Sequence, residues 1–384
     1  MVTWEYPPRV VGGISRHCHG LAKALVQKNQ EVHLITLEFP GAPSYEVDEG
    51  VYLHRVSIEL GHPHFLTWTL LFNHFIEKRV GQIFQDYKPD IIHAHDWLVA
   101  TSSISMKYYL KTPLVATIHS TEVGRAGGLH SPDSYTINGL EWWVTYEAKR
   151  VIVTSEAMRR EVLDQFHLPQ EKVNVIPNAI DLEKFNLEVD TDRVRSKYAL
   201  PYEKVVLFVG RLTPQKGAEY LIRAAPMILE RHPEAKIVIA GDGWLREDLE
   251  TLAKRVDKTG KILFTGFLSD RELIEIMLCA DVLVVPSVYE PFGIVALEGM
   301  AAGVPVVASE IDGLAEIVKN EKTGVTVYPR NSDSIAWGVN RVLSDPGYAK
   351  WLSKNAKEYV QKTYNWQITA EKTISLYHEA VSSL

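Results

Sequence analysis

Two glutamates, Glu290 and Glu298, lie in a string that runs from a predicted buried strand through a Pro/Gly turn into a predicted helix. Carboxylates in these positions can each accept hydrogen bonds from vicinal hydroxyls, on a sugar and on a ribose. The N–H groups at the start of the helix would point at a phosphate, and they belong to Gly293, Ile294 and Val295. An isolated glutamate pair would be surface acids beside a glycine turn, but the complete string favours a binding site.

A basic turn, Gly210–Gly217, follows the first predicted strand of the second half of the chain and contains Arg211 and Lys216. Arginine supplies a planar fork and lysine a movable point charge, and such a pair suits a diphosphate. A solvated basic loop is the alternative. We favour the anion site because open α/β sheets bind their ligands at the carboxyl ends of the strands.

A third turn places Gly12 and Gly13 between a short strand and a helix. Paired glycines let the backbone approach a phosphate at a helix start. A tight strand-to-helix turn explains them equally well, so this turn is weak support by itself. It lacks the G-x-G-x-x-G spacing and therefore disfavours a nicotinamide dinucleotide.

The elements that must position these turns form two series, in which short β-branched runs alternate with longer amphipathic stretches. A charged, irregular segment, Leu182–Lys197, separates the two series. We therefore predict two Rossmann-like domains. The predicted strands are Val32–Thr36, Ile91–His95, Leu114–Ile118, Val151–Thr154, Val173–Ile176, Val205–Val209, Ile237–Ala240, Ile262–Thr265, Val282–Pro286 and Val306–Ala308. The predicted helical stretches are Ile14–Lys28, Phe72–Gln85, Ala218–Arg231, Leu245–Val256 and Tyr348–Ser383.

Composition excludes several classes of protein. The chain has 384 residues and a formal net charge of -7, which argues against a general nucleic-acid binder. Two distant cysteines, Cys18 and Cys279, suggest neither a disulfide framework nor a cysteine zinc site. No apolar run is long enough to span a membrane, and the start does not resemble a signal peptide. We expect a cytoplasmic protein.

The string from Glu290 to Ala308, E-P-F-G-x-x-x-x-E-G-M-A-A-G-x-P-V-V-A, resembles the signature of retaining glycosyltransferases of family 4. The likeness runs from Glu5 to about Tyr364. Further motifs similar to those of the family are Gly12-Gly13, Ile176–Asp181, Gly210–Leu212 with Lys216-Gly217, Gly241–Gly243 and Phe264–Gly266.

This resemblance implies an α/β protein of GT-B architecture, with two Rossmann-like α/β/α domains, a cleft between them and a C-terminal helix crossing back. We expect an N-terminal acceptor domain over residues 1–185, joined by the helix 365–384. A donor domain is expected over residues 186–364.

The resemblance also implies roles for residues. Arg211 and Lys216 would hold the donor diphosphate, Glu298 the ribose, and Glu290 the donor sugar. The expected donor-binding residues are Gly12, Gly13, Arg211, Lys216, Gly241, Asp242, Gly266, Leu268, Glu290, Phe292, Gly293, Ile294, Val295 and Glu298.

His119 follows a predicted strand and matches a family histidine near the transferred sugar. Its imidazole could bond a sugar hydroxyl or support developing charge, whereas a structural histidine at a strand end is the alternative. We assign catalytic roles to His119, Glu290, Arg211 and Lys216. In glucan-making relatives a string similar to His95-Asp96-Trp97 lies near the acceptor, so Asp96 and Trp97 are expected on the acceptor side. The start Trp4–Pro8 resembles that of glycogen-synthase-type members.

We expect no metal site and no required cofactor beyond a UDP-, ADP- or GDP-sugar as substrate. His93-x-His95 and His17-Cys18-His19 are tempting strings, but neither has a clear third ligand in sequence. The D-x-D string Asp190–Asp192 falls in the charged segment and is interpreted as solvated surface.

The apolar stretch Phe65–Phe75 could contact lipid or a second subunit. We favour packing in the N-terminal core and do not favour membrane association. The oligomeric state, the nucleotide base, the sugar and the acceptor stay open.

The sequence therefore predicts a retaining hexosyltransferase that uses a nucleoside diphosphate sugar, with glucose as the favoured sugar and an α-glucan or small sugar as acceptor. A lipid or cell-surface glycan acceptor is the alternative. Two other classes are a non-catalytic nucleotide-sugar binder and a GT-B-like epimerase.

Overall fold

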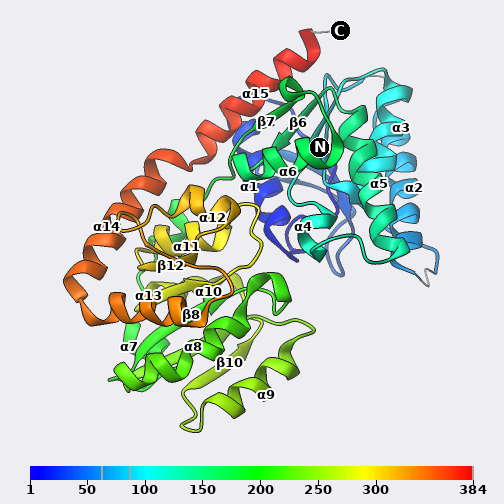
Figure 1. Ribbon diagram of the computed structural model, residues 1–384. Coiled ribbons are helices and arrows are strands. Elements are labelled where there is room, and N and C mark those ends of the chain that lie inside the picture. The colour runs from blue at the N-terminus through cyan, green and yellow to red at the C-terminus, as the bar shows by residue number, and fades with distance from the viewer. Residues whose placement is uncertain (62–63, 86–87, 383–384) are drawn as a thin grey trace. The chain divides into compact units, whose positions relative to one another are not determined.

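The computed structural model describes residues 1–61, 64–85 and 88–382, and the chain forms two compact units (Figure 1). Unit 1 comprises Met1–Ala179 and Trp366–Leu384, and unit 2 comprises Ile180–Asn365. Each unit is built on a largely parallel sheet with helices packed against it, as the alternation of short apolar runs and amphipathic stretches predicted. The C-terminal helix thus belongs to the same unit as the N-terminus.

The first residues of the chain hold the sheet of unit 1 together. Val2 forms parallel bridges with Ile35 on one side and Ala94 on the other. It thereby joins strands in the order β1-β3-β2 to strands in the order β4-β5-β6-β7, and only β2 runs antiparallel to its neighbour among the described pairs. Because the chain winds outward in both directions from this segment, the loops after Val2 and after β4 meet at a switch point. The strands are β1 His33–Leu37, β2 Tyr45–Asp48, β3 Val51–Val56, β4 Ile92–His95, β5 Leu114–Ile118, β6 Arg150–Val153 and β7 Val173–Val175.

Several helices of unit 1 begin at polar caps. Ser131 and Ser155 accept the N–H groups of Ser134 and Met158, which satisfies donors that a helix start leaves open. The helices are α1 Gly13–Gln27, α2 Phe65–Ile83, α3 Ala100–Leu110, α4 Glu122–Ala126, α5 Pro132–Glu147, α6 Glu156–Phe166 and α15 Trp366–Ser382, with 3₁₀ turns η1 Trp97–Val99 and η2 Gln170–Lys172.

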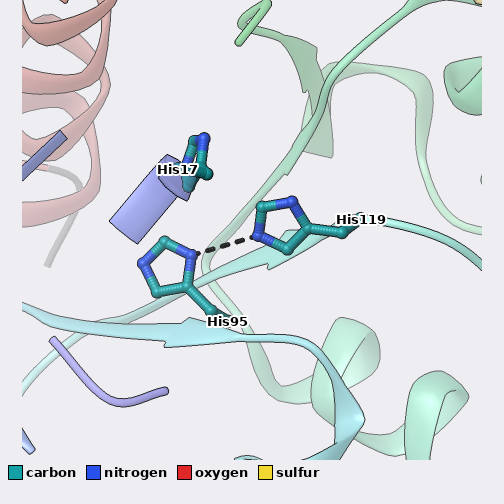
Figure 2. Close-up of side chains that lie close together, drawn as sticks. All are labelled: His17, His95 and His119. Atoms are coloured by element: carbon teal, nitrogen blue, oxygen red, sulfur yellow. Dashed lines mark hydrogen bonds between the residues drawn. The ribbon is translucent and has the colours of Figure 1, made fainter. Parts of the chain in front are cut away.

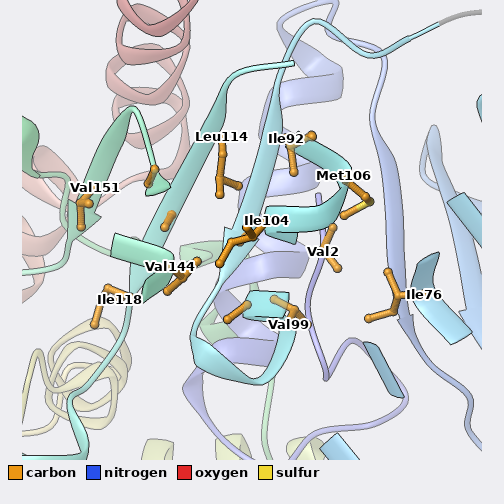
Figure 3. Close-up of a cluster of buried hydrophobic side chains, with 14 of the residues drawn as sticks. Val2, Ile76, Ile92, Val99, Ile104, Met106, Leu114, Ile118, Val144 and Val151 are labelled. Atoms are coloured by element: carbon orange, nitrogen blue, oxygen red, sulfur yellow. The ribbon is translucent and has the colours of Figure 1, made fainter. Parts of the chain in front are cut away.

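The main core of unit 1 lies between the sheet and helices α2, α3 and α5 (Figure 3). All five residues of β5 are buried, as expected for a parallel strand covered on both faces. Phe72 of the apolar stretch is fully buried, as is Ile76 just after the stretch, which confirms core packing for this part of α2. Phe65 and Leu70 remain 52% and 56% exposed. Within the described part of the chain, no helix is both long and apolar enough to cross a membrane.

The sheet of unit 2 has the order β10-β9-β8-β11-β12-β13, and its strand pairs are parallel. The chain starts at β8, moves outward to β10, and then returns to the other side of β8 for β11. The switch point therefore lies between β8 and β11. The strands are β8 Lys204–Val209, β9 Ala235–Ala240, β10 Ile262–Gly266, β11 Val282–Val285, β12 Val306–Ser309 and β13 Val325–Val327.

The charged segment before β8 is more ordered than predicted, because it contains η3 Leu182–Phe185 and α7 Thr191–Arg195. Asp190, in the D-x-D string, caps α7 by accepting the N–H of Arg193 at 3.0 Å. The other elements of unit 2 are η4 Pro214–Lys216, α8 Ala218–Arg231, α9 Arg246–Val256, α10 Asp270–Cys279, α11 Ile294–Ala302, α12 Asp312–Ile317, α13 Ser332–Ser344 and α14 Pro346–Thr363.

Three differences from the predicted elements have local causes. The hairpin of β2 and β3 was not predicted, because β2 lies at the sheet edge with a mixed polar pattern. Strand β13 was not predicted, because it is only three residues long. The single predicted helical stretch after Tyr348 is two helices that part at Tyr364–Asn365, where the chain passes from unit 2 to unit 1; its predicted last residue, Ser383, lies outside the described residues.

Candidate active site

The switch point of unit 2 brings together two of the predicted turns. The loop after β8 carries Lys216, and the loop after β11 carries Glu290. Lys216 Nζ donates to Glu290 Oε2 at 2.7 Å, and the Ser287 hydroxyl donates to the same oxygen at 3.0 Å. Glu290 is only 8% exposed. An opposite-charge pair in so enclosed a position fixes both side chains at one point of the sheet edge.

The backbone around Glu290 is equally constrained. Its N–H donates to Asp312 at 3.2 Å, and its carbonyl accepts the N–H of Gly313 at 3.0 Å. These bonds tie the turn after β11 to the start of α12. The carboxylate is therefore presented from a fixed turn.

Glycines let the loops at this edge approach one another. A Cβ on Gly217 would lie 2.0 Å from the carbonyl oxygen of Pro286, and one on Gly241 would lie 1.9 Å from that of Gly210. Both glycines also have positive φ, +67° and +138°. Glycine is therefore required at position 241 for packing, because the absence of a side chain allows the loops after β8 and β9 to touch.

Helix α11 offers its N-terminus at the same edge. Gly293, with φ +104°, is the N-cap residue and has no side chain with which to cap the helix. The N–H groups of the first turn and the positive end of the helix dipole suit an anion. Glu298 lies one turn into α11 and is 7% exposed, so it lies close beneath this anion-binding end.

The remaining predicted donor residues differ in their surroundings. Arg211 is exposed. Asp242 pairs with Arg246 at 3.2 Å. Phe292 is 5% exposed and packs in the core, with its ring 5.8 Å from that of Tyr364. A donor contact at Phe292 would therefore come from its backbone. Gly266 is buried and Leu268 partly buried, and both lie directly at the end of β10.

The switch point of unit 1 carries Asp96 and His119. Asp96 lies directly after β4 with φ 64° and ψ 177°, a backbone region that non-glycine residues rarely occupy. Its Oδ1 accepts the N–H of His119 at 2.8 Å. Burial raises the pKa of Asp96 to about 6, although Arg125 and the N–H groups of His119 and Ser120 oppose this. Trp97, by contrast, packs in a hydrophobic cluster with Leu98 and Ile137.

A buried charged group that sequence reasoning missed lies beside Asp96. Arg125 Nη2 donates to Glu141 at 2.7 Å, and its Nη1 donates to the carbonyl and hydroxyl of Ser120. Burial raises the pKa of Glu141 to about 7, although Arg125 lowers it. No short motif marks these two residues, since they lie on helices α4 and α5 and meet only in the fold.

The glycine turn of unit 1 is held by a residue from the start of the chain. Glu5 Oε2 accepts the N–H groups of Val11 and Gly12 at 2.7 and 3.0 Å. Glu5 is 1% exposed. The buried carboxylate therefore orders the turn before α1, so these two N–H groups already have a partner. Gly13 is exposed at the first residue of the helix.

Three histidines from distant parts of the sequence converge in unit 1 (Figure 2). His17 lies on α1, His95 ends β4, and His119 follows β5. His95 Nδ1 and His119 Nε2 are 3.3 Å apart. Burial lowers the pKa of His17 and His95 well below the usual value and that of His119 to about 3, so all three rings are neutral at pH 7. Sequence reasoning considered His17 and His95 separately and did not place them beside His119.

Comparison with known proteins identifies the family. Residues 190–359 match the model of glycosyl transferases group 1, and residues 11–184 match that of glycosyltransferase family 4. An uncharacterised glycosyltransferase of Methanocaldococcus jannaschii is 47% identical, over 100% of this chain and 98% of its own length. A glycogen synthase of Mycobacterium tuberculosis is 35% identical, over 98% of this chain and 93% of its own.

Among solved structures, sucrose-phosphate synthase from Thermosynechococcus elongatus superposes with a TM-score of 0.84 at 27% identity, covering 100% of this chain and 98% of that one. These likenesses extend over both units and confirm the predicted fold class. The chain belongs to the glycosyltransferases of family 4, with a GT-B fold and similarity to glycogen synthases.

Proposed function

We propose that this glycosyltransferase moves a glucosyl group from a nucleoside diphosphate glucose to a hydroxyl of an α-glucan or small sugar, with retention of anomeric configuration. The nucleotide is a UDP, ADP or GDP carrier, and no further cofactor is required. Unit 2 is the donor domain and unit 1 the acceptor domain. The similarity to a glycogen synthase and to a sucrose-phosphate synthase supports a glucosyl donor.

The observation that carries the proposal is the Lys216–Glu290 pair at the switch point of unit 2. A cation for a diphosphate and a carboxylate for sugar hydroxyls lie 2.7 Å apart, directly beside the N-terminus of α11. A nucleoside diphosphate hexose needs the cation and the carboxylate next to each other, because its diphosphate is attached directly to the sugar that carries the hydroxyls. Glu298 would accept the ribose hydroxyls, and Arg211 would fold over the diphosphate.

The bond-breaking step leaves negative charge on the diphosphate. Lys216, Arg211 and the N–H groups of Gly293–Val295 stabilise that charge more in the transition state than before it. The leaving phosphate oxygen helps to take the proton of the acceptor hydroxyl, so the mechanism assigns no protein nucleophile. His119 contacts the transferred sugar, and its neutral imidazole suits a hydrogen bond to a hydroxyl.

The proposal is tested in two stages. Thermal unfolding is measured with UDP-, ADP- and GDP-glucose, since a donor at about 100 times its Kd stabilises the folded chain by about 2.7 kcal/mol. The donor that stabilises the chain is then incubated with maltooligosaccharides, and NMR determines the anomeric configuration of the product. A β-linked product would disprove retention. Donor binding without release of nucleotide with any acceptor, maltooligosaccharide or lipid, would identify a non-catalytic binder, and conversion of the donor without acceptor would identify an epimerase.

A lipid or cell-surface glycan acceptor is the second candidate. The exposed side chains of Phe65 and Leu70 on α2 favour it, because exposed apolar groups on an amphipathic helix can enter a lipid surface. Flotation with anionic liposomes decides between the two. Co-flotation that is lost in Phe65→Ser/Leu70→Ser would favour a lipid acceptor, and no co-flotation would favour the glucan.

A further inference from the structure

The most unusual cluster of the molecule is formed by His17, His95 and His119. One nitrogen from each ring lies within 4.8 Å of the other two, and Figure 2 shows the rings converging from three separate elements. His17 and His95 are buried, whereas His119 is partly exposed. The cluster is therefore largely enclosed, and His119 is its only partly exposed member.

A hydrogen bond orients the ring of His17 in the way that metal-binding histidines are usually oriented. His17 Nδ1 bonds Asn178 Oδ1 at 2.6 Å, so this nitrogen carries the proton and Nε2 carries the lone pair. In the described residues, His17 Nε2 is buried without a hydrogen-bond partner. A histidine ligand commonly donates its other ring N–H to an oxygen acceptor, which fixes the tautomer and raises the basicity of the ligating nitrogen.

The spacing of the nitrogens also suits a metal ion. His95 Nδ1 and His119 Nε2 are 3.3 Å apart, and the ligands of tetrahedral zinc, with bonds of about 2.0–2.1 Å, lie about 3.3 Å from one another. The third nitrogen is at most 4.8 Å from the others, so the rings must move closer together when an ion binds. Without an ion, the neutral rings of His95 and His119 share one N–H···N contact. In the described residues, the lone pair on His17 Nε2 then accepts no hydrogen bond.

From this geometry we propose that His17, His95 and His119 form a binding site for a divalent transition-metal ion, with Zn²⁺ as the best fit. Three neutral imidazoles suit zinc, nickel, cobalt and copper better than magnesium or calcium, which prefer oxygen ligands. Three histidine ligands leave a fourth coordination position of a tetrahedral ion for water or substrate. The nearby carboxylate of Asp96, which accepts the N–H of His119, offsets part of the ion's charge.

The site lies in unit 1 and differs from the proposed diphosphate site of unit 2, which needs no metal. Its consequence rests on the proposed function: an ion that takes the lone pair of His119 prevents that ring from contacting the transferred sugar. Zinc is therefore an inhibitor of transfer, and a chelator restores activity.

Binding is tested on the full chain after treatment with a chelator. Calorimetric titration with ZnCl₂ is expected to show one ion per chain with micromolar or tighter affinity, and X-ray absorption of the zinc-loaded chain is expected to show three imidazole nitrogens at about 2.0–2.1 Å. His17→Gln and His95→Gln should each weaken binding at least about tenfold, as expected for loss of a ligand. His130→Ala, which removes an exposed histidine of the same unit, should leave binding unchanged.

The outcomes separate the two proposals. Absence of stoichiometric zinc binding by the wild-type chain, or a zinc spectrum without histidine nitrogens, would overturn the site even if both glutamine variants failed to fold. Loss of binding in His130→Ala alone would do the same. If the chain transfers no sugar, the proposed function fails, but calorimetry and absorption spectroscopy still decide the metal site. If zinc binds and transfer continues at the same rate, the inhibitory role is wrong.

Discussion

The two units share a topology and differ in the chemistry at their switch points. In unit 2 the switch point holds a charged pair, Lys216 and Glu290, beside an open helix end. In unit 1 it holds Asp96 and a group of neutral buried histidines. All but one of the 14 histidines belong to unit 1, and His232 is the exception. The same α/β arrangement can therefore position either fixed charges or neutral hydrogen-bonding groups at its strand ends.

The largest predicted effect concerns the charged pair. Lys216→Ala should lower kcat/KM by about 10²–10³, the usual cost of removing one group that stabilises transition-state charge. Steady-state kinetics with the donor found by thermal shift measures it. Lys258→Ala, which changes an exposed lysine of the same unit, is the control.

Because Lys216→Ala also leaves the buried Glu290 without its cation, a double-mutant cycle with Glu290→Gln is needed. Equal losses in the single and double variants would show that the two side chains act as one group. An activity near that of wild type in Lys216→Ala would remove the main support for a donor site at this edge.

The next effect concerns the backbone that brings the loops of unit 2 together. Gly241→Ala places a Cβ 1.9 Å from the Gly210 carbonyl oxygen and should destabilise unit 2 by at least about 1–3 kcal/mol. Calorimetric melting measures the loss. Gly303→Ala is the matched control, because Gly303 also has positive φ, +77°, but nothing lies near its Cβ position among the described residues. Equal losses in both variants would assign the cost to backbone strain rather than loop contact.

A smaller effect, greater in unit 1 than in unit 2, is expected from pH. Burial lowers the pKa of His54 in unit 1 to about 4, below the value of about 6.5 in an unfolded chain. The unfolded chain binds the proton more tightly between these values, so this contribution to stability is complete above pH 6.5 and is lost as the pH falls toward 4. The buried histidines His17, His93 and His95 have the same sign. Asp96 and Glu141, whose pKa values are raised by burial, have the opposite sign, but these two groups are outnumbered by the histidines.

Amide hydrogen exchange at pH 7.5 and pH 5, with chelator present, should therefore show unit 1 losing more protection than unit 2. His54→Gln should reduce the difference. A greater loss in unit 2 would show that buried histidines do not set the acid response.

The smallest effects should be alike in the two units. Ser155→Ala removes the cap of α6 in unit 1, and Ser269→Ala removes the capping box of α10 in unit 2. Each should cost about 1 kcal/mol, measured by denaturant unfolding. If the loss of unfolding free energy in one unit were more than twice that in the other, the two units would differ in how strongly a helix cap stabilises them as well as in their site chemistry.

Local sequence patterns were sufficient to predict most strands of unit 2 and the loops of its candidate site. The β-branched runs predicted its strands to within two residues, except β13, and the strings around Lys216 and Glu290 predicted loops that meet at one sheet edge. Such loops are short and follow their strands directly, so parallel strand order places them side by side. The glycine strings also fit, because Gly217 and Gly241 occupy positions that a Cβ would block.

The chemistry of unit 1 depended on contacts across long stretches of chain. Arg125 meets Glu141 between two helices, and His17 meets His95 and His119 from α1, β4 and the end of β5. None of these groups forms a string with fixed spacing, since their proximity arises from packing of whole elements. The sequence by itself determined the fold class, the family and the donor-side motifs, because these reside in local periodicity and short turns. Only the tertiary structure decided which histidines share one enclosed space, because burial and distance between separate elements are set by the packed core.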